Sequence, residues 1–394
     1  MSNNFYELKE GSAETNMIIR VLFTIAVIAI SLLGYTAYMD RNLEVIEAAK
    51  IPLTIKAVPV PNQQFATRET EIKEVPSLYW RGGFKINSPH KRFGGLSGLE
   101  VSTDGRSLLA IGDKGLWFTG RLNYDLNGNL LSLTNGLIST MKGSLGENLV
   151  RKKDRDSESI ALADSGAIFV SFERDHRILE YSAPLTTTTG AIPLPSEFTD
   201  IASSNRGIEA LTWLSGDCLL AIPERTTTPP TTTRSSQESV IEAYLLHQGS
   251  WDKLYLEPNK NYLPTGLSST AEGDLLLLER EFSFWEGFKS SLRLFTASEI
   301  ENGLATQGYV MRGDILATFE GAQSIDNMEG ISSRIGANGE TLIYLLSDDN
   351  LNFAQDTLLL MFELQKQRKP AGQSTAGCSK NKTSYSAALE TKAF

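Results

Sequence analysis

The stretch IEALTWLSGDCLLAIPER, residues 208–225, carries the pattern that decides the fold. Two apolar runs of strand length flank the turn sequence Ser215-Gly216-Asp217, and the stretch ends in Glu224 and Arg225. Two short apolar runs joined by a Gly-containing turn predict a β-hairpin.

The same pattern occurs at four other places in the chain. Each copy has a small or acidic residue, an apolar run, a Gly-containing turn, a second apolar run and a terminal acid. The other copies are LSGLEVSTDGRSLLAIGDKG (96–115), SESIALADSGAIFVSFERD (157–175), PTGLSSTAEGDLLLLERE (264–281) and MEGISSRIGANGETLIYLLSDDN (328–350). Counted from Ser97, Glu158, Glu209, Thr265 and Glu329, the copies are 51 to 64 residues apart. Such intervals fit one four-stranded blade of a β-propeller.

We therefore predict an all-β fold, a β-propeller, over residues 76–364. Five repeats are visible. Further strands near 77–86 and 356–364 suggest about six blades, the last one closed by both ends of the domain. Helical periodicity is scarce between these limits.

Composition narrows the function classes. Of 394 residues, 41% are hydrophobic and 21% charged, which is ordinary for a globular chain with a sizeable core. The formal net charge of -10 disfavours nucleic acid as a partner, because phosphate binding depends on clustered Lys and Arg. The three histidines are scattered, which argues against a histidine-built metal site.

The N-terminal region contains a different signal. Residues 21–39, VLFTIAVIAISLLGYTAYM, are uncharged and about as long as the ~20 apolar residues that a membrane-spanning helix needs. We favour an uncleaved signal anchor after an N-terminal segment (1–20); the alternative is a signal peptide cleaved near Ala37. A stalk (40–75) and a disordered tail (365–394) complete the expected organisation. The predicted location is the inner membrane, crossed once, with the propeller in the periplasm or outside the cell.

Hairpin geometry predicts which side chains meet. Two residues of an antiparallel hairpin lie opposite each other when their midpoint falls in the turn. On this count three hairpins pair two acids, and two pair a hydroxyl residue with an acid. The expected pairs are Glu158 with Glu173, Glu209 with Glu224, Glu329 with Asp348, Ser97 with Asp113, and Thr265 with Glu279. Because blades repeat around an axis, we expect these eight acids at one rim.

Carboxylates placed this close repel unless a cation or a proton lies between them. Arg174, Arg225 and Arg280 directly follow three of the acids and would reach a neighbouring blade more easily, because adjacent strand residues point to opposite faces. The alternative cation is Ca²⁺, a hard ion that prefers oxygen ligands. The candidate metal ligands are Glu158, Glu173, Glu209, Glu224, Glu329 and Asp348. The acids could also form only structural salt bridges between blades.

Other residues give weaker signals. Ser97 in GGLSG lacks the Gly-x-Ser-x-Gly spacing of a nucleophile elbow. His176 is either a proton shuttle or an exposed loop histidine. Trp117, Trp213 and Trp285 are most simply explained by core or inter-blade packing.

Five blocks of this sequence, taken in order, resemble one known family. The blocks are 94–115, 156–181, 205–224, 264–280 and 326–364, the last ending DNLNFAQDTLLLMFEL. Together they resemble the phytase-like family described by "esterase-like activity of phytase", over roughly residues 75–364.

The resemblance implies a bacterial exported propeller that hydrolyses an ester or phosphoester, and phytase-type propellers bind calcium through acidic clusters. The sequence departs from the family pattern at Gly112, where Ser commonly precedes Asp113. In the fourth repeat, Thr265 stands where other repeats of this chain carry Glu.

Two functions follow as hypotheses. The first is a Ca²⁺-assisted hydrolase of a small ester or phosphoester, with Glu158 or Glu209 activating water and Arg174 and Arg280 binding the substrate. The second is a non-catalytic propeller that binds a ligand or partner at the cell surface, since the fold hosts many such proteins.

Overall fold

The computed structural model describes residues 50–60, 77–183, 185, 188–195, 207–227, 239–283, 285, 287–319, 326–350 and 355–365. The chain divides into two units, Met1–Glu47 and Ala48–Phe394. The first unit, with the predicted anchor at 21–39, lies outside the described residues, as does the predicted tail beyond Gln365. In the described part, no helix has the length and apolar character needed to span a bilayer.

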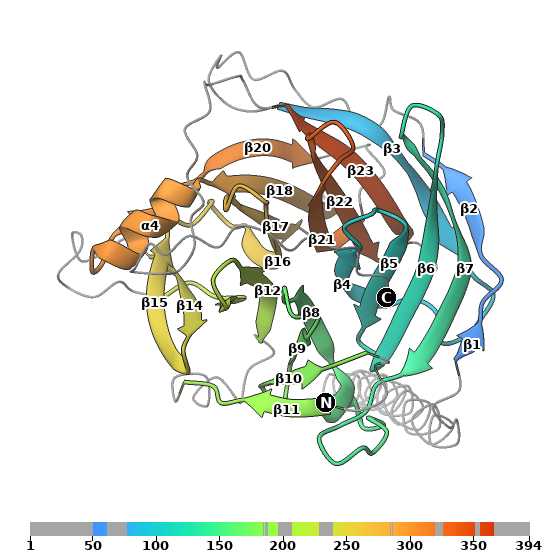
Figure 1. Ribbon diagram of the computed structural model, residues 1–394, viewed down its shortest axis with the longest axis horizontal. Coiled ribbons are helices and arrows are strands. Elements are labelled where there is room, and N and C mark those ends of the chain that lie inside the picture. Colours follow the sequence, from blue (N-terminus) through green and yellow to red (C-terminus); the bar gives the residue numbers. More distant parts are fainter. Residues whose placement is uncertain are drawn as a thin grey trace, which may run out of the picture. The chain divides into compact units, whose positions relative to one another are not determined.

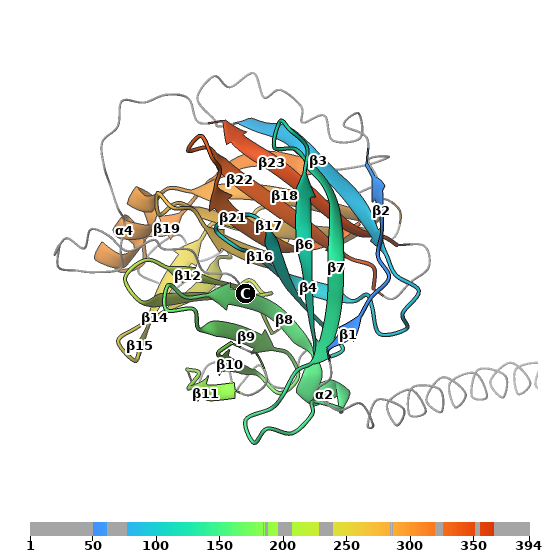
Figure 2. The same ribbon diagram turned by 45° about the vertical axis from the view of Figure 1, so that its right-hand side comes forward.

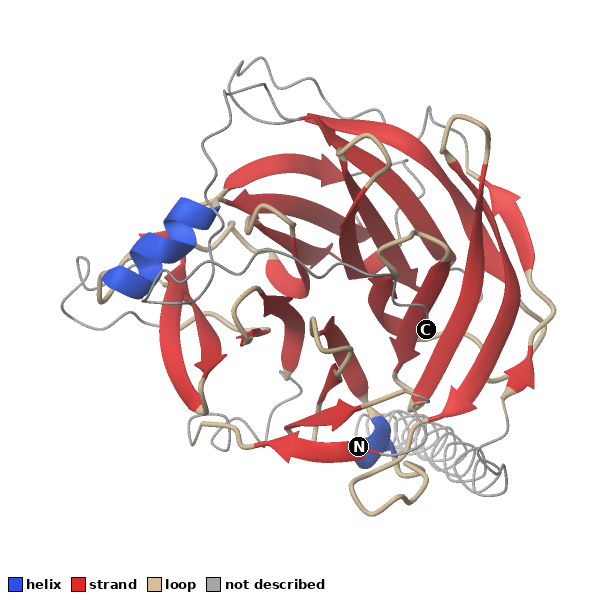
Figure 3. Ribbon diagram, viewed as in Figure 1, coloured by secondary structure: helices blue, strands red, loops and turns tan. Residues whose placement is uncertain are grey.

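In the described residues of the second unit, the regular structure is almost entirely β-strand (Figure 3). Its strands are β1 (Ile51–Pro52), β2 (Lys56–Pro59), β3 (Ser77–Asn87), β4 (Leu96–Val101), β5 (Ser107–Gly112), β6 (Leu116–Tyr124), β7 (Leu130–Thr140), β8 (Ser157–Leu162), β9 (Ile168–Phe172), β10 (Arg177–Tyr181), β11 (Thr188–Ile192), β12 (Ile208–Leu214), β13 (Cys218–Pro223), β14 (Ile241–His247), β15 (Ser250–Leu256), β16 (Leu263–Ser269), β17 (Leu275–Ser283), β18 (Gly287–Phe295), β19 (Val310–Met311), β20 (Asp314–Phe319), β21 (Asn327–Ile335), β22 (Thr341–Asp348) and β23 (Thr357–Gln365). The described helices are α2 (Lys152–Arg155) and α4 (Ala297–Ala305).

Within the described residues the strands form five four-stranded antiparallel units arranged in a ring (Figures 1 and 2). The units, from the axis outward, are β4-β5-β6-β7, β8-β9-β10-β11, β12-β13-β14-β15, β16-β17-β18-β20 and β21-β22-β23-β3. Each inner strand packs beside the next, and β21 closes the circle against β4. This is a β-propeller, and the predicted hairpins form the two inner strands of every blade.

The expected number of blades was wrong by one. The flanking strands do not make a sixth blade, because β23 and β3 complete the blade that begins with the fifth repeat. As predicted, that blade is closed by both ends of the domain. A parallel bridge from Gly82 to Leu130 also joins it to the first blade, where a Cβ on Gly82 would lie 2.4 Å from the Leu130 carbonyl oxygen.

Residues 51–59 lie in the segment expected to be a stalk, but they form two short strands. β1 pairs with β7 and β2 pairs with β3, on the outside of the ring. The prolines in this segment fit such a place, because an edge strand tolerates a residue without an N–H.

The core is divided among the blade interfaces. The described residues contain five apolar clusters, and each lies between two neighbouring blades. The run Leu275–Leu278 shows why the inner strands are apolar on both faces. Leu276 and Leu278 pack toward the fifth blade, whereas Leu275 and Leu277 pack toward the third, and all four are fully buried.

Tryptophans contribute to two of these interfaces. Trp117 packs edge-on against Tyr181 of the next blade, and Trp213 stacks on Phe169 of the preceding one. Trp285, also expected to pack, is instead 89% exposed at the tip of the β17–β18 hairpin.

Candidate functional site

All five inner strands contain a β-bulge at the same place. The bulged residues are Ser97, Glu158, Glu209, Thr265 and Glu329. A bulge inserts one unpaired residue and changes the direction of the following side chains. These are the five residues from which the repeats were counted, so the periodicity in the sequence corresponds to a periodic irregularity in the sheets.

The bulges shift each expected pair by one residue or more, so the predicted cross-strand register was wrong, although the carboxylate oxygens of Glu158 and Glu173 do come within 4.8 Å of each other. The amide N–H of Glu173 donates to the carbonyl oxygen of Asp156, and that of Glu224 donates to Gly207. In the remaining hairpins, Asp348 lies opposite Asn327, Asp113 donates its N–H to the Gly95 carbonyl oxygen, and Glu279 lies opposite Pro264.

The two bulged hydroxyl residues bind backbone of the next blade. Ser97 Oγ donates to the Ser157 carbonyl oxygen at 2.6 Å, and Thr265 Oγ1 donates to the Met328 carbonyl oxygen at 3.1 Å. In both cases the acceptor directly precedes the bulged glutamate of the next blade. Ser97 is only 4% exposed, so its hydroxyl serves inter-blade contact rather than nucleophilic attack.

The three bulged glutamates share one electrostatic environment. Burial raises the pKa of Glu158 well above its ordinary value, and the charges of Glu209 and Glu329 raise it further. Burial likewise raises the pKa of Glu209, and Glu224 and Glu329 add to the shift. The blades therefore bring together carboxyl groups from the second, third and fifth repeats, as the repeat argument predicted.

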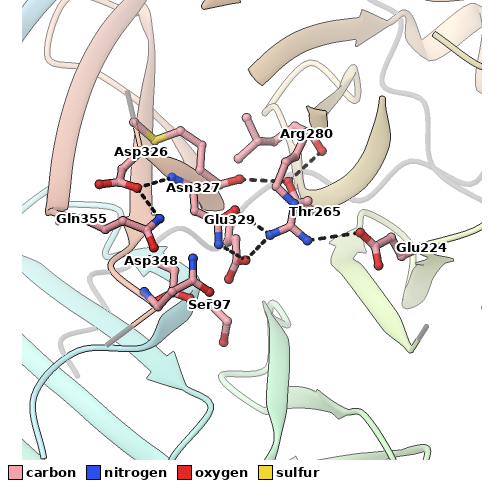
Figure 4. Close-up of polar contacts among 12 residues, drawn as sticks. Ser97, Glu224, Thr265, Arg280, Asp326, Asn327, Glu329, Asp348 and Gln355 are labelled. Carbon is pink, nitrogen blue, oxygen red and sulfur yellow. Dashed lines mark hydrogen bonds and ion pairs between the residues drawn. The ribbon is translucent and has the colours of Figure 1, made fainter. Parts of the chain in front are cut away.

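Arg280 neutralises one side of this group (Figure 4). Its Nη1 donates to Glu329 Oε1 at 2.6 Å and to Asn327 Oδ1 at 2.5 Å, and its Nη2 donates to Glu224 Oε1 at 3.1 Å. Arg280 comes from the fourth blade, Glu329 from the fifth and Glu224 from the third. It serves both neighbouring blades, which confirms the predicted reach for this arginine.

Among the described residues, Arg174 and Arg225 form ion pairs within their own blades, contrary to the same expectation. Arg174 Nε lies 2.5 Å from Asp156 Oδ2, and Arg225 Nη2 lies 3.6 Å from Glu242 Oε2. Both arginines follow the end of an inner hairpin, where the chain turns back toward its own sheet.

A second group of carboxylates is compact enough to hold an ion. Oxygen atoms of Asp156, Glu158 and Glu173 all lie within 4.8 Å of one another. Two ligands of one Ca²⁺, each at 2.3–2.6 Å, lie no more than about 5.2 Å apart, so the three side chains fit such an ion. Asp156 was missed in the sequence, because it precedes the repeated pattern and only the bulge brings it opposite Glu173.

The remaining predicted ligand and rim acids divide in two. Asp348 belongs with the three bulged glutamates, because burial and then the charges of Glu329 and Asp113 raise its pKa to about 9. Glu279 does not, because it is fully buried against Arg293, whose Nη1 lies 3.0 Å from Glu279 Oε1. For Glu279 the structural salt bridge was the correct alternative.

His176 is partly buried, and neither ring nitrogen has a hydrogen-bond partner among the described residues. It is therefore not the exposed loop histidine that the sequence also allowed.

These features define a β-propeller in which carboxylates from several blades lie together near the bulges of the inner strands. The chain belongs to the phytase-like family described as "esterase-like activity of phytase", which it matches over residues 91–351. A comparison with curated proteins finds no match.

Solved structures give more distant likenesses. A gluconolactonase from Xanthomonas campestris has 11% identity and a TM-score of 0.38, with 81% of this chain and 99% of that chain covered. A catalytically inactive virginiamycin B lyase from Staphylococcus aureus has 11% identity and a TM-score of 0.34, with 78% and 99% covered. At these scores neither structure bears on the function of this chain.

Proposed function

We propose that this chain is a Ca²⁺-assisted hydrolase of ester or phosphoester bonds, with Asp156, Glu158 and Glu173 as the residues that hold the ion. The observation that carries the proposal is the spacing of their oxygen atoms, all within 4.8 Å. Family membership supports the reaction class.

Charge supports a cation at this place. The group contains Asp156, Glu158, Glu173, Glu209, Glu224, Glu329 and Asp348, whereas two arginines, Arg174 and Arg280, are bonded to it. Buried and half-buried carboxylates in such excess take up protons or bind a cation. A bound Ca²⁺ would supply charge neutralisation and polarise an oxygen of the substrate.

Glu209 is the candidate general base. Its charge acts on Glu158, but it lies outside the compact group of three, and it is 9% exposed. Burial and neighbouring acids raise its pKa, so its ionised form is a stronger base than an ordinary carboxylate. In the proposed reaction Glu209 takes a proton from the water that attacks the carbonyl carbon or phosphorus. The bond to the ester oxygen then breaks and Glu209 returns the proton to that oxygen, so the products are an alcohol and a carboxylic acid or phosphate.

The two arginines differ in what they offer a substrate. The side chain of Arg174 is 33% exposed and lies beside Asp156. Arg280 is 20% exposed and is already bonded to Glu224, Asn327 and Glu329. We assign Arg174 to substrate contact and Arg280 to positioning of the glutamates.

Titration calorimetry of the full chain with Ca²⁺ tests the metal site. We expect binding that Asp156→Asn and Glu158→Gln each weaken at least tenfold, because each removes one anionic ligand. Asp314→Asn, an exposed carboxylate on the outer strand β20, is the control and should bind as the parent chain does. Unchanged binding in both site variants would remove the proposed metal site.

Hydrolysis of p-nitrophenyl acetate and p-nitrophenyl phosphate tests the reaction. Loss of a general base costs about 10²–10⁴-fold in rate, so Glu209→Gln should reduce turnover by that factor while Ca²⁺ binding persists. Absence of turnover with both substrates in the parent chain would favour the alternative, a ligand-binding propeller without a nucleophile. The structural role of Ser97 is the observation that keeps this alternative open.

We also propose that residues 21–39 anchor the chain in the inner membrane, with the propeller in the periplasm or outside. The support is the uncharged apolar length of this segment. Separation of membrane, periplasm and medium tests it, and recovery of the full-length chain in a soluble fraction would contradict it.

A further inference from the structure

Three positively charged side chains converge at the first blade, beside the carboxylate group. Arg92 lies in the connection between β3 and β4, Lys114 in the turn between β5 and β6, and Arg155 at the end of α2. The backbone brings them together. Next to Lys114, a Cβ on Gly115 would lie 2.8 Å from Cβ of Arg155, and Lys114 Nζ donates to the Lys91 carbonyl oxygen at 3.2 Å.

The positive charges of these side chains repel one another, which disfavours their charged forms. Burial lowers the pKa of Arg92, and the charge of Arg155 lowers it further. Burial also lowers the pKa of Lys114. The charges of Asp113 and Asp349 act in the opposite direction, and those of Arg155 and Arg92 lower the pKa by smaller amounts. Like charges held together away from water are destabilising unless an anion offsets them.

The protein's own groups satisfy this cluster only in part. Arg92 is 8% exposed, and Nη2 donates to Thr140 Oγ1 at 3.0 Å. Its Nε is buried and has no hydrogen-bond acceptor among the described residues. Asp113 Oδ1 is also buried and has no hydrogen-bond donor among them. A buried guanidinium nitrogen without an acceptor is costly in a folded protein.

We propose that Arg92, Lys114 and Arg155 form an anion subsite that binds a phosphate group of the substrate. This proposal rests on the proposed hydrolase function, because the bound phosphate is part of a substrate only if the chain hydrolyses phosphoesters. It lies next to the carboxylate group, since the charges of Lys114, Arg155 and Asp156 all act on Asp113.

Phosphate suits the cluster better than a carboxylate does. A phosphate monoester carries close to two negative charges at neutral pH, whereas a carboxylate carries one. It therefore neutralises more of the positive charge of the three side chains. Its oxygens accept from the fork of an arginine, and a lysine serves as a point charge beside them.

Calorimetry of the full chain with inorganic phosphate, in EDTA at constant ionic strength, tests the subsite. Chelation removes divalent ions, so phosphate cannot bind through Ca²⁺. We expect Lys114→Gln and Arg92→Gln to weaken phosphate binding at least tenfold. Lys153→Gln, an exposed lysine of the same helix as Arg155, should remain within twofold of the parent chain.

Three outcomes overturn the proposal. Absence of phosphate binding to the parent chain, or equal binding by Lys114→Gln, excludes the subsite, and Lys114 lies in a turn where this change does not threaten folding. Acetate that binds as tightly as phosphate excludes the assignment to phosphate. A chain that binds phosphate but neither Ca²⁺ nor p-nitrophenyl substrates would keep the subsite and lose the hydrolase, so the two failures are distinguishable.

Discussion

Glu100 is an acid held between the inner strands of three blades. It lies on β4; the Leu162 N–H of β8 donates to Oε1 at 3.2 Å, and Ser332 Oγ of β21 donates to Oε2 at 3.2 Å. Burial raises the pKa of Glu100 to about 8, although both hydrogen bonds act in the opposite direction. At neutral pH the folded chain therefore holds a proton here that the unfolded chain releases.

The free energy of unfolding should fall as the pH rises through this range. A group with a raised pKa in the folded state contributes its stability below the unfolded pKa and loses it as the pH passes the folded pKa. Glu100→Gln keeps a neutral side chain at every pH. We expect it to remove roughly 1–3 kcal/mol of the fall seen between pH 5 and 8.5.

Urea unfolding at several pH values measures this difference. Glu301→Gln, an exposed acid of α4, is the control and should follow the parent profile. Superimposable profiles for Glu100→Gln and the parent chain would show that Glu100 is ionised when buried.

At the scale of the strand, the repeated bulge explains a second periodic feature. The residue after each bulge is small: Gly98, Ser159, Ala210, Gly266 and Gly330. Inner strands of neighbouring blades approach closely here, and a Cβ on Gly266 would lie 2.5 Å from the Glu329 carbonyl oxygen. The inner strands can meet around the axis only where these side chains are short.

Gly266→Ala should destabilise the ring. A methyl group against a backbone atom forces β16 and β21 apart, and overpacking of this kind costs about 1–3 kcal/mol. Gly190→Ala, where the added Cβ meets nothing within 4 Å, is the matched control. Chemical unfolding of both variants measures the cost, and equal stability would mean that the inner strands can separate without penalty.

The strands and hairpins could be predicted because alternation and turn residues determine them locally. The register could not, because a bulge adds one residue to a strand without changing its apolar pattern. Asp156 was therefore missed as the residue opposite Glu173, although Glu158 does lie near Glu173 and the small residue after each bulge was a usable signal. Glu279 was misplaced for another reason: Arg293 lies 14 positions away on the next strand, outside the repeated pattern.

At the scale of the molecule, the ring depends on one strand from the start of the domain. β3 pairs along β23 from Ser77 to Ile86, and Phe84 and Ile86 are buried in the cluster between the fifth and first blades. Counting blades from the sequence failed here, because two distant strands that complete one blade look like separate units.

Truncation tests the importance of this closure. Of the described strands, a chain that begins at residue 77 loses β1 and β2 alone, and it should unfold cooperatively at a modestly lower Tm. A chain that begins at residue 88 also loses β3, which exposes β23 as an edge and removes Phe84 from the core. We expect no cooperative thermal transition by circular dichroism, and a normal transition in this chain would show that four-stranded closure is dispensable.

The same strand order constrains how the protein is made. On the ribosome β3 is synthesised before the whole of residues 88–356, and β23 is synthesised after them. At 5–20 residues per second this delay is about 14–54 s, during which β3 has an unpaired edge. The earliest part of the domain to emerge is therefore among the last to become native, and a nascent chain needs protection from misassociation until translation is nearly complete.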